Sequence, residues 1–365
     1  MKNFNQHINL MLKRTITLFI LLLLICNTNN AQIAIDSNFS FTAYGETYFS
    51  KDFAEFKQPV RPNFYYNHKK NNQLSVNLAM AKLSYTSKKL RANLGLMVGD
   101  YATYNLSNEP NWAKNIFEAN IGYKLSNKEN LWLDVGILNS HIGFESAIGL
   151  DCYTLTRSIL ADNSPYYETG AKLGYTTKNN KWFFNLLWLN GWQKIVTPNG
   201  FSKANFGIQV NYKPNENVTF NYSNFIGSDK PDTAKATRMY HNIYVQYNLS
   251  KKLGIIAGID IGNDKSDTKN YNYWFTPISI IQYKINTKCT TALRLEYFND
   301  ANETLIQTNI GKGFKVFGTS FNVDYNLFKK LYWRAEIKWL EASQNIFENN
   351  SKNNVSFVSN LSIKI

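Results

Sequence analysis

Leu331-Tyr-Trp-Arg-Ala-Glu-Ile-Lys-Trp-Leu-Glu341 alternates apolar and polar side chains along its length. Trp333 and Ile337 fall on one parity. Arg334 and Glu336 fall on the other. A period of two places successive side chains on opposite faces of a β-strand. The stretch therefore predicts a strand with one apolar face and one polar face.

The same alternation recurs along the chain and predicts about sixteen strands, with fourteen to eighteen also compatible with the pattern. Each is close to the ~9–11 residues of a tilted membrane strand. The predicted strands are 39–50, 73–86, 90–101, 115–125, 131–138, 166–176, 181–191, 203–213, 217–227, 238–249, 252–262, 273–285, 289–298, 314–326, 331–342 and 354–365.

Short turns and long connectors alternate between these strands. Residues 87–89 and 328–330 are short turns, whereas 51–72 and 139–165 are long connectors. This rhythm is typical of outer-membrane barrels, and a water-soluble sandwich, the alternative, does not predict it. We therefore expect an all-β, transmembrane, antiparallel up-and-down barrel. An even number of strands would put both termini on the short-turn, periplasmic side.

The first 31 residues are typical of a secretory signal peptide. Lys2, Lys13 and Arg14 precede an apolar run, and Ala31 offers a cleavage site. The apolar run is too short for a transmembrane helix, which needs roughly 20 residues. Residues 32–365 are then expected to form a single barrel domain.

The charged residues bear on the partners and on the lumen. Cleavage lowers the formal net charge from +14 to +11, because the signal peptide holds three of the 40 basic residues and no acidic residue. The lysines are spread over turns and form no nucleic-acid motif, so we expect no nucleic-acid partner. Sixteen strands enclose an aqueous channel. The side chains expected to line its water are Arg91, Glu168, Lys172, Arg238, Arg294, Glu296, Arg334 and Glu336.

Residues 139–165 form the longest interruption of the strand pattern, between the fifth and sixth strands. Long ordered loops tend to be functional, and this one mixes apolar and charged residues. It is predicted to fold into the lumen as a constriction loop, with a short helix over residues 153–161 capped by Asp151. The apolar inner face of residues 181–191 is expected to meet it. A loop that caps the outside is the alternative. The candidate constriction residues are His141, Glu145, Asp151, Arg157 and Asp162. Of these, Glu145, Asp151 and Arg157 are expected to face the water.

Catalytic and metal sites find little support. Ser140 and His141 are adjacent, and no nucleophile-elbow motif surrounds the serine. The acidic stretch 260–267 lacks the ligand spacing of a calcium loop. Cys152 and Cys289 form no Cys-x-x-Cys motif, and the sequence does not say whether they pair. We expect no enzymatic activity, no metal and no cofactor.

Several motifs carry a family resemblance. Ser140-His-Ile-Gly-Phe-Glu-Ser-Ala-Ile-Gly149, Asn163-Ser-Pro-Tyr-Tyr-Glu-Thr-Gly170 and the flanking Tyr65-Tyr-Asn-His68 resemble the OmpL-like putative beta-barrel porin-2 family. The resemblance covers about residues 40–195. It implies a porin-like outer-membrane protein of a Gram-negative bacterium and brings no catalytic residues. The last residue, Ile365, departs from the aromatic residue that ends many such barrels.

The sequence thus predicts a porin that passes small hydrophilic solutes by passive diffusion, with a weak anion preference drawn from the lumen arginines. Its partners would be outer-membrane lipid, lipopolysaccharide and the solutes. The oligomeric state is left open, a homo-oligomer included. The alternative is a barrel without through-flow that serves adhesion, assembly or ligand binding.

Overall fold

The computed structural model describes residues 37–54, 59–265, 271–308 and 310–365. The chain divides into two compact units, Met1–Phe39 and Ser40–Ile365, and the second unit holds the fold. The predicted signal peptide, residues 1–31, lies outside the described residues.

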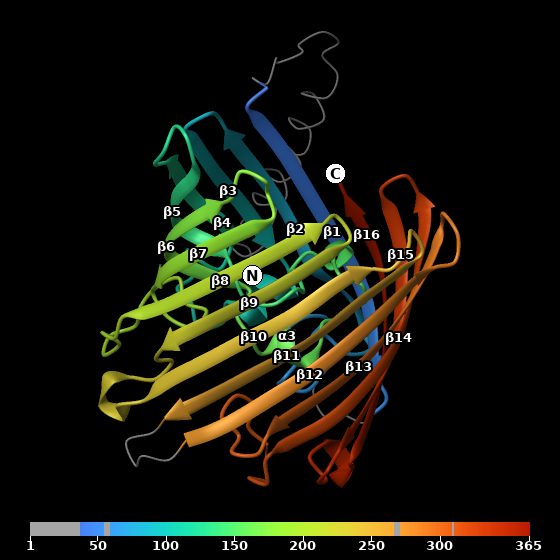
Figure 1. Ribbon diagram of the computed structural model, residues 1–365. Coiled ribbons are helices and arrows are strands. Elements are labelled where there is room, and N and C mark those ends of the chain that lie inside the picture. The colour runs from blue at the N-terminus through green and yellow to red at the C-terminus, as the bar shows by residue number, and fades with distance from the viewer. Residues whose placement is uncertain (1–36, 55–58, 266–270, 309) are drawn as a thin grey trace, which may run out of the picture. The chain divides into compact units, whose positions relative to one another are not determined.

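Sixteen antiparallel strands form a closed barrel in which each strand is hydrogen-bonded to its sequence neighbours (Figure 1). β1 pairs with β16, Tyr44 lying opposite Lys364, and this pairing closes the ring and removes free strand edges. The predicted fold class and strand number are confirmed. The strands are β1 (Phe39–Asp52), β2 (Gln73–Thr86), β3 (Leu90–Val98), β4 (Ile116–Lys124), β5 (Asn130–Asn139), β6 (Tyr167–Thr176), β7 (Trp182–Leu189), β8 (Asn205–Asn215), β9 (Val218–Gly227), β10 (Thr237–Asn248), β11 (Leu253–Lys265), β12 (Tyr271–Lys284), β13 (Cys289–Asp300), β14 (Phe314–Phe328), β15 (Leu331–Ala342) and β16 (Asn353–Lys364).

The two faces of the strands differ as the alternation predicts. In β15, Trp333 and Ile337 are exposed on the outer face. Arg334 and Lys338, on the other parity, are each only 1% exposed. Every backbone group of a membrane strand must be paired and its outer side chains must suit lipid, and the closed ring with an apolar outer parity meets both needs.

The connections alternate between short turns and long segments. Residues 329–330 join β14 to β15, whereas residues 140–166 join β5 to β6. The helices all lie in long connections, and in the described part of the chain none is long and apolar enough to cross a membrane. They are α2 (Asp100–Asn105), α3 (Ile159–Asp162) and the 3-10 turns η1 (Gly149–Asp151), η2 (Asp232–Ala234) and η3 (Glu348–Asn350).

The position predicted for the helix in residues 139–165 is wrong. The α-helix begins only at Ile159, and its N-cap is Ser158, whose Oγ accepts a hydrogen bond from the Ala161 N–H at 3.0 Å. The residues before it are not α-helical because the Leu155 and Thr156 N–H groups donate to strand side chains instead of to a helix. Tertiary contacts override the local helix signal here.

Candidate functional site

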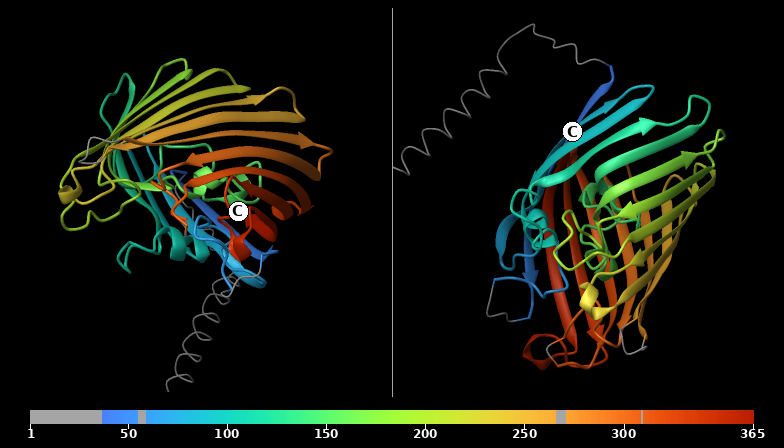
Figure 2. Two further views of the ribbon diagram at one scale, coloured as in Figure 1. Left: turned by 90° about the horizontal axis from the view of Figure 1, so that it is seen from below. Right: turned by 90° about the vertical axis from the view of Figure 1, so that its left-hand side faces the viewer.

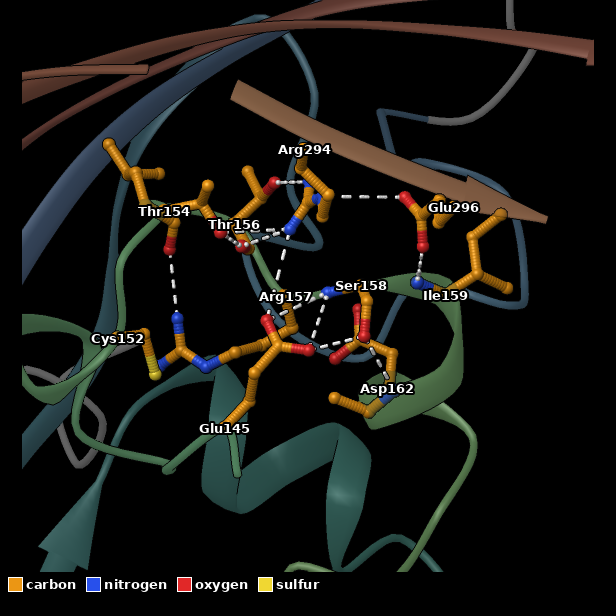
Figure 3. Close-up of polar contacts among 12 residues, drawn as sticks. Glu145, Cys152, Thr154, Thr156, Arg157, Ser158, Ile159, Asp162, Arg294 and Glu296 are labelled. Carbon is orange, nitrogen blue, oxygen red and sulfur yellow. Dashed lines mark hydrogen bonds and ion pairs between the residues drawn. The ribbon is translucent and has the colours of Figure 1, made fainter. Parts of the chain in front are cut away.

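Residues 139–165, called the inner loop, lie within the ring of strands (Figure 2). β13 and β15 hold its middle. The Thr156 N–H donates to Glu336 Oε2 at 2.6 Å, and the Thr156 carbonyl accepts from Arg294 Nη1 at 2.8 Å. Arg294 Nη1 also donates to Thr154 Oγ1 at 3.0 Å (Figure 3). A buried, non-helical backbone segment is thus supplied with partners by inward side chains of the wall.

Further anchors extend along the inner loop. The Glu296 carboxylate accepts from the Ile159 N–H at 2.7 Å (Figure 3). Arg334 donates to the Gly149 carbonyl at 2.6 Å and to the Cys152 carbonyl at 3.1 Å. Hydrogen bonds to charged side chains are stronger than neutral ones, so these contacts hold the inner loop in one position.

His141 fixes the start of the inner loop to another part of the wall. Its Nδ1 lies 2.8 Å from Glu168 Oε2, and its Nε2 lies 2.7 Å from the Asn224 carbonyl. Both partners accept, so both ring nitrogens donate and the imidazole is charged. Burial opposes that charge, but the Glu168 carboxylate outweighs burial and raises the pKa of His141. β6 and β9 are therefore joined through this residue.

Arg157 does not face water, contrary to prediction, and only 4% of the Glu145 side chain is exposed. Arg157 is 0% exposed, and its guanidinium donates to the carbonyls of Ser146 at 2.6 Å, Leu155 at 2.8 Å and Ala147 at 3.0 Å. These bonds tie the two limbs of the inner loop together, because its buried carbonyls need donors.

The Glu145 carboxylate accepts hydrogen bonds from the Ser158 N–H at 3.1 Å and from the Ser158 hydroxyl (Figure 3). Burial raises the pKa of Glu145, although Arg294 acts in the opposite direction. Asp151 alone of the three is exposed as predicted, and it forms an ion pair with Lys364 Nζ at 2.5 Å.

The candidate lumen residues all lie on the inner parity, but most of them contact protein and not water. Arg294, Glu296, Arg334 and Glu336 are at most 5% exposed and bind the inner loop, as does Glu168 through His141. The water-lined face expected there is replaced by a loop-binding face, because the inner loop fills the space that they surround.

The other three candidate lumen residues form ion pairs on the wall. Arg238 pairs with Asp264 at 2.8 Å and with Asp229 at 3.1 Å. Arg91 and Lys172 share Asp134, at 2.5 and 3.9 Å. The Arg91 side chain is 33% exposed and the Lys172 side chain is 24% exposed, so both remain accessible from the lumen.

Apolar contacts complete the seat of the inner loop. Ile142 packs in one buried cluster with Leu187 and Leu189 of β7, as the apolar inner face of residues 181–191 predicts. Ile159 packs in another cluster with Phe298 of β13 and Leu340 of β15. The inner loop therefore contacts opposite parts of the wall by both polar and apolar groups.

A second segment, residues 59–72, also folds inward, and the sequence analysis missed it. Tyr65 is 1% and His68 0% exposed. Asn67 Nδ2 donates to Asp162 Oδ1 of the inner loop at 2.7 Å, and burial raises the pKa of Asp162. Asn163 Nδ2 donates back to the Phe64 carbonyl at 3.1 Å. The aromatic run at residues 64–66 was the available signal.

Cavities lie on both sides of the inner loop. A turn-side cavity of about 430 Å³ is lined by Lys82, Glu145 and Lys364 among others. A loop-side cavity of about 260 Å³ is lined by residues of several long connections. A small space of about 10 Å³, called the neck, shares the lining residue Glu145 with the first cavity and Ser164 with the second. A space of this size holds about one water molecule.

Comparisons with solved structures find porins. An outer-membrane protein OmpT of Vibrio cholerae in its trimer form matches with TM-score 0.59 and 10% identity, over 90% of this chain and 99% of that one. An anion-selective porin of Comamonas acidovorans matches with TM-score 0.59 and 9% identity, over 90% and 99%. The outer-membrane channel DcaP of Acinetobacter baumannii matches with TM-score 0.59 and 10% identity, over 89% and 97%. At these identities the likeness concerns the fold alone.

A search of curated protein sequences finds no match. The family model described as "Putative beta-barrel porin-2, OmpL-like" matches residues 38–364, which include all of the barrel strands from β1 to β16. Porins of this kind reside in the bacterial outer membrane. The chain belongs to the OmpL-like beta-barrel porin-2 family.

Proposed function

We propose that this protein is a porin through which small hydrophilic solutes diffuse passively, and that the inner loop is its constriction. The family and the barrel supply the general setting. The observation that carries the proposal is the neck of about 10 Å³, which shares lining residues with two larger cavities and is lined by inner-loop residues from both limbs of that loop, Phe144 and Leu160 among them.

The neck sets the expected size limit. Constrictions of a pore select by diameter and by the groups that line them. A neck that holds about one water molecule passes water and small ions slowly and admits larger solutes only when the inner loop shifts. The protein is therefore proposed to be a low-conductance porin.

A weak anion preference belongs to the same proposal. It is supported by the net charge of the exported chain and by the arginines on the inner parity. Arg238, Arg294 and Arg334 each have a carboxylate partner within 3.4 Å, so the preference stays weak. The reversal potential in a salt gradient tests it, and a clear cation preference would refute it.

The orientation of the barrel in the membrane and its partners belong to the same proposal. An even strand number with short turns at one end supports periplasmic termini. The exposed apolar outer parity supports contact with outer-membrane lipid and lipopolysaccharide. A homo-oligomer remains a proposal, for which the trimer form of one structural neighbour is the support.

A barrel without through-flow, used for adhesion, assembly or ligand binding, is the second candidate. The dense hydrogen bonding of the inner loop favours it, since a rigid plug conducts nothing. Purified protein in a planar bilayer separates the two. Stepwise ion currents are expected of a porin, and silence at high protein loading would refute the proposal.

A deletion variant tests the role of the inner loop directly. Removal of residues 143–160 takes away part of the lining of the neck, Phe144, Glu145 and Leu160 included, and should raise the single-channel conductance. Removal of residues 199–202, a mostly exposed part of another long connection that lines neither cavity nor the neck, is the control and should leave the conductance near its original value. Equal conductance of the parent and the 143–160 deletion would mean that the inner loop is only a lid.

A further inference from the structure

The end of the barrel that carries the short turns is strongly basic. Its exposed lysines are Lys88, Lys89, Lys128, Lys178, Lys181, Lys213, Lys251, Lys252, Lys284, Lys288, Lys329 and Lys330. The short turns hold two acidic residues, Glu129 and Glu216, and Glu129 is already paired with Lys178 at 2.9 Å. The long connections carry both signs of charge, and the one between β9 and β10 holds two aspartates and two lysines. Positive charge is therefore concentrated at one end of the barrel.

Eight lysines at this end face one another in pairs across neighbouring strands. In each pair the backbone N–H of one lysine donates to the carbonyl of the other, so the two residues stand opposite each other. The four pairs, with their N···O distances, are Lys89 and Lys124 at 2.9 Å, Lys181 and Lys213 at 2.7 Å, Lys252 and Lys284 at 2.8 Å, and Lys330 and Lys364 at 3.4 Å. They lie at the turn-side ends of β3 and β4, β7 and β8, β11 and β12, and β15 and β16, so they are spread around the ring.

These pairs lie on the inner parity of the wall. At the end of β12, Lys284 lies between Tyr283 and Ile285, which are both exposed on the outer face. Lys364 lines the turn-side cavity. The same alternation of exposed apolar neighbours places the other pairs inside. The pairs therefore surround the turn-side mouth of the lumen.

Most of these lysines have no counter-charge within the protein. Lys364 forms an ion pair with Asp151 at 2.5 Å. None of the other seven forms an ion pair with a residue in the part of the chain that the structure describes. Like charges directly opposite each other on neighbouring strands destabilise a sheet, and the wall repeats that arrangement at four places. An anion that approaches such a pair from solution relieves the repulsion.

We propose that the four lysine pairs, called the lysine ring, attract small anions to the turn-side mouth and set the anion preference of the pore there. A charged mouth raises the local concentration of counter-ions and the rate at which they enter. The inner arginines are less suited to this role, because Arg238, Arg294 and Arg334 already have carboxylate partners. The inference deepens the proposed anion preference, and it rests on the proposed porin function for the route of the anions. It also makes the preference depend on the side from which the ions enter.

The electrostatic potential at the mouth can be measured without any conductance. Thr42 lines the turn-side cavity and Ser107 lines the loop-side cavity, so Thr42→Cys and Ser107→Cys place a thiol in each. Both are made in a Cys289→Ser background, where the buried Cys152 reacts slowly. The rates of labelling by a sulfonate and by a trimethylammonium methanethiosulfonate are then compared. The ratio of the sulfonate rate to the trimethylammonium rate should be about sevenfold higher at Thr42→Cys, which corresponds to a potential difference of about one kT per unit charge. The difference should vanish in about 1 M salt, where the Debye length is ~3 Å.

Reversal potentials test the dependence on side. A single channel is held first in one KCl gradient of about tenfold and then in the opposite gradient, because dilute salt leaves the nearby charges unscreened. The anion preference should be larger when the dilute solution bathes the lysine ring. The two reversal potentials should therefore differ in magnitude for the parent.

Variants assign both effects to the lysine ring. The combined substitutions Lys124→Gln, Lys181→Gln, Lys252→Gln and Lys330→Gln remove one charge from each pair. They should lower the rate ratio at Thr42→Cys about threefold and bring the two reversal potentials together. The matched control removes the same charge from exposed lysines of the long connections, by Lys230→Gln, Lys235→Gln, Lys312→Gln and Lys352→Gln, and should change neither.

Folding of each variant is checked by heat-modifiable migration in gels. If the fourfold variant does not fold, Lys252→Gln with Lys284→Gln replaces it and should give a smaller change in the same direction.

The outcomes separate this inference from the porin proposal. An equal rate ratio at the two cysteines, or a ratio at Thr42→Cys that the lysine substitutions leave unchanged, would overturn the inference. Equal reversal potentials in the two gradients would also overturn it for a parent that conducts. A silent bilayer would overturn the porin proposal, and the labelling rates would still decide whether the lysine ring attracts anions.

Discussion

Arg157 is the residue whose replacement should loosen the inner loop while leaving the barrel wall intact. Arg157→Met keeps an unbranched side chain but removes the donors to the Ser146, Ala147 and Leu155 carbonyls. All three bonds are internal to the inner loop, so no pairing between strands is touched.

The magnitude follows from those three bonds. A hydrogen bond to a charged group contributes about 1.5–3 kcal/mol, and three of them about 5–9 kcal/mol. Removal of a buried cation returns several kcal/mol of desolvation free energy. We expect the docked inner loop to lose about 3 kcal/mol relative to its open form, which makes opening about a hundredfold more frequent.

The Cys152 thiol reports that opening. It is 7% exposed, and burial raises the pKa of Cys152, so it reacts slowly while the inner loop is docked. In a Cys289→Ser background, maleimide labelling of Cys152 should be about a hundredfold faster with Arg157→Met.

The control for this experiment is Lys128→Met, on an exposed residue of the turn between β4 and β5. It should label at the parent rate. An unchanged labelling rate in Arg157→Met, with a barrel that still migrates as folded, would refute the reasoning that Arg157 holds the inner loop closed.

The remaining predictions concern pH, the second inward segment and conductance. The pKa of His141 is raised above 6.5 when the inner loop is docked, so its contribution to docking is full below pH 6.5 and is lost as pH rises through the raised pKa. Channel conductance should therefore increase from pH 6 to pH 9 in the parent, and His141→Gln should flatten that profile; the same slope in both would contradict it. Asn67→Leu should free residues 59–72 from Asp162, at a cost of about 1–3 kcal/mol, and should speed proteolysis of that segment; unchanged proteolysis would argue against the contact. Glu336→Gln weakens the hold on Thr156, and it should raise current noise without changing strand content by circular dichroism; parent-like noise would contradict this.

The sequence predicts the strands of the barrel wall better than the segments that fold inside the barrel. Most strands of the wall carry their own period-two signal, and the sequence of β15 predicts a strand before any partner is known. β7 is an exception, because it is apolar on both faces. The inner loop has no such repeat. The contacts of Thr156 depend on Arg294 and Glu336, which lie 138 and 180 residues further along the chain. No local pattern encodes that distance, so the short helix was expected in the wrong place.

The environment of charged residues on the inner parity could not be predicted from the local pattern either. Alternation correctly assigns Arg334 to the inside of the barrel. Alternation does not show whether an inward side chain contacts water or protein, because a polar side chain is compatible with both. Residues 59–72 were missed for a related reason, since their aromatic run could equally lie at a membrane interface.

The anchoring of the inner loop has a consequence for biogenesis. Arg334 lies 185 residues beyond Gly149, the carbonyl to which it donates. If β1 and β16 paired while the inner loop was outside the barrel, Arg294 would lose its acceptors on Thr154 and Thr156, and Arg334 would lose the Gly149 and Cys152 carbonyls. We therefore expect the late strands to assemble around a loop that has already entered. Entry of the inner loop and closure of the barrel would then be one step. A chain whose inner loop cannot dock would stop folding before β1 pairs with β16.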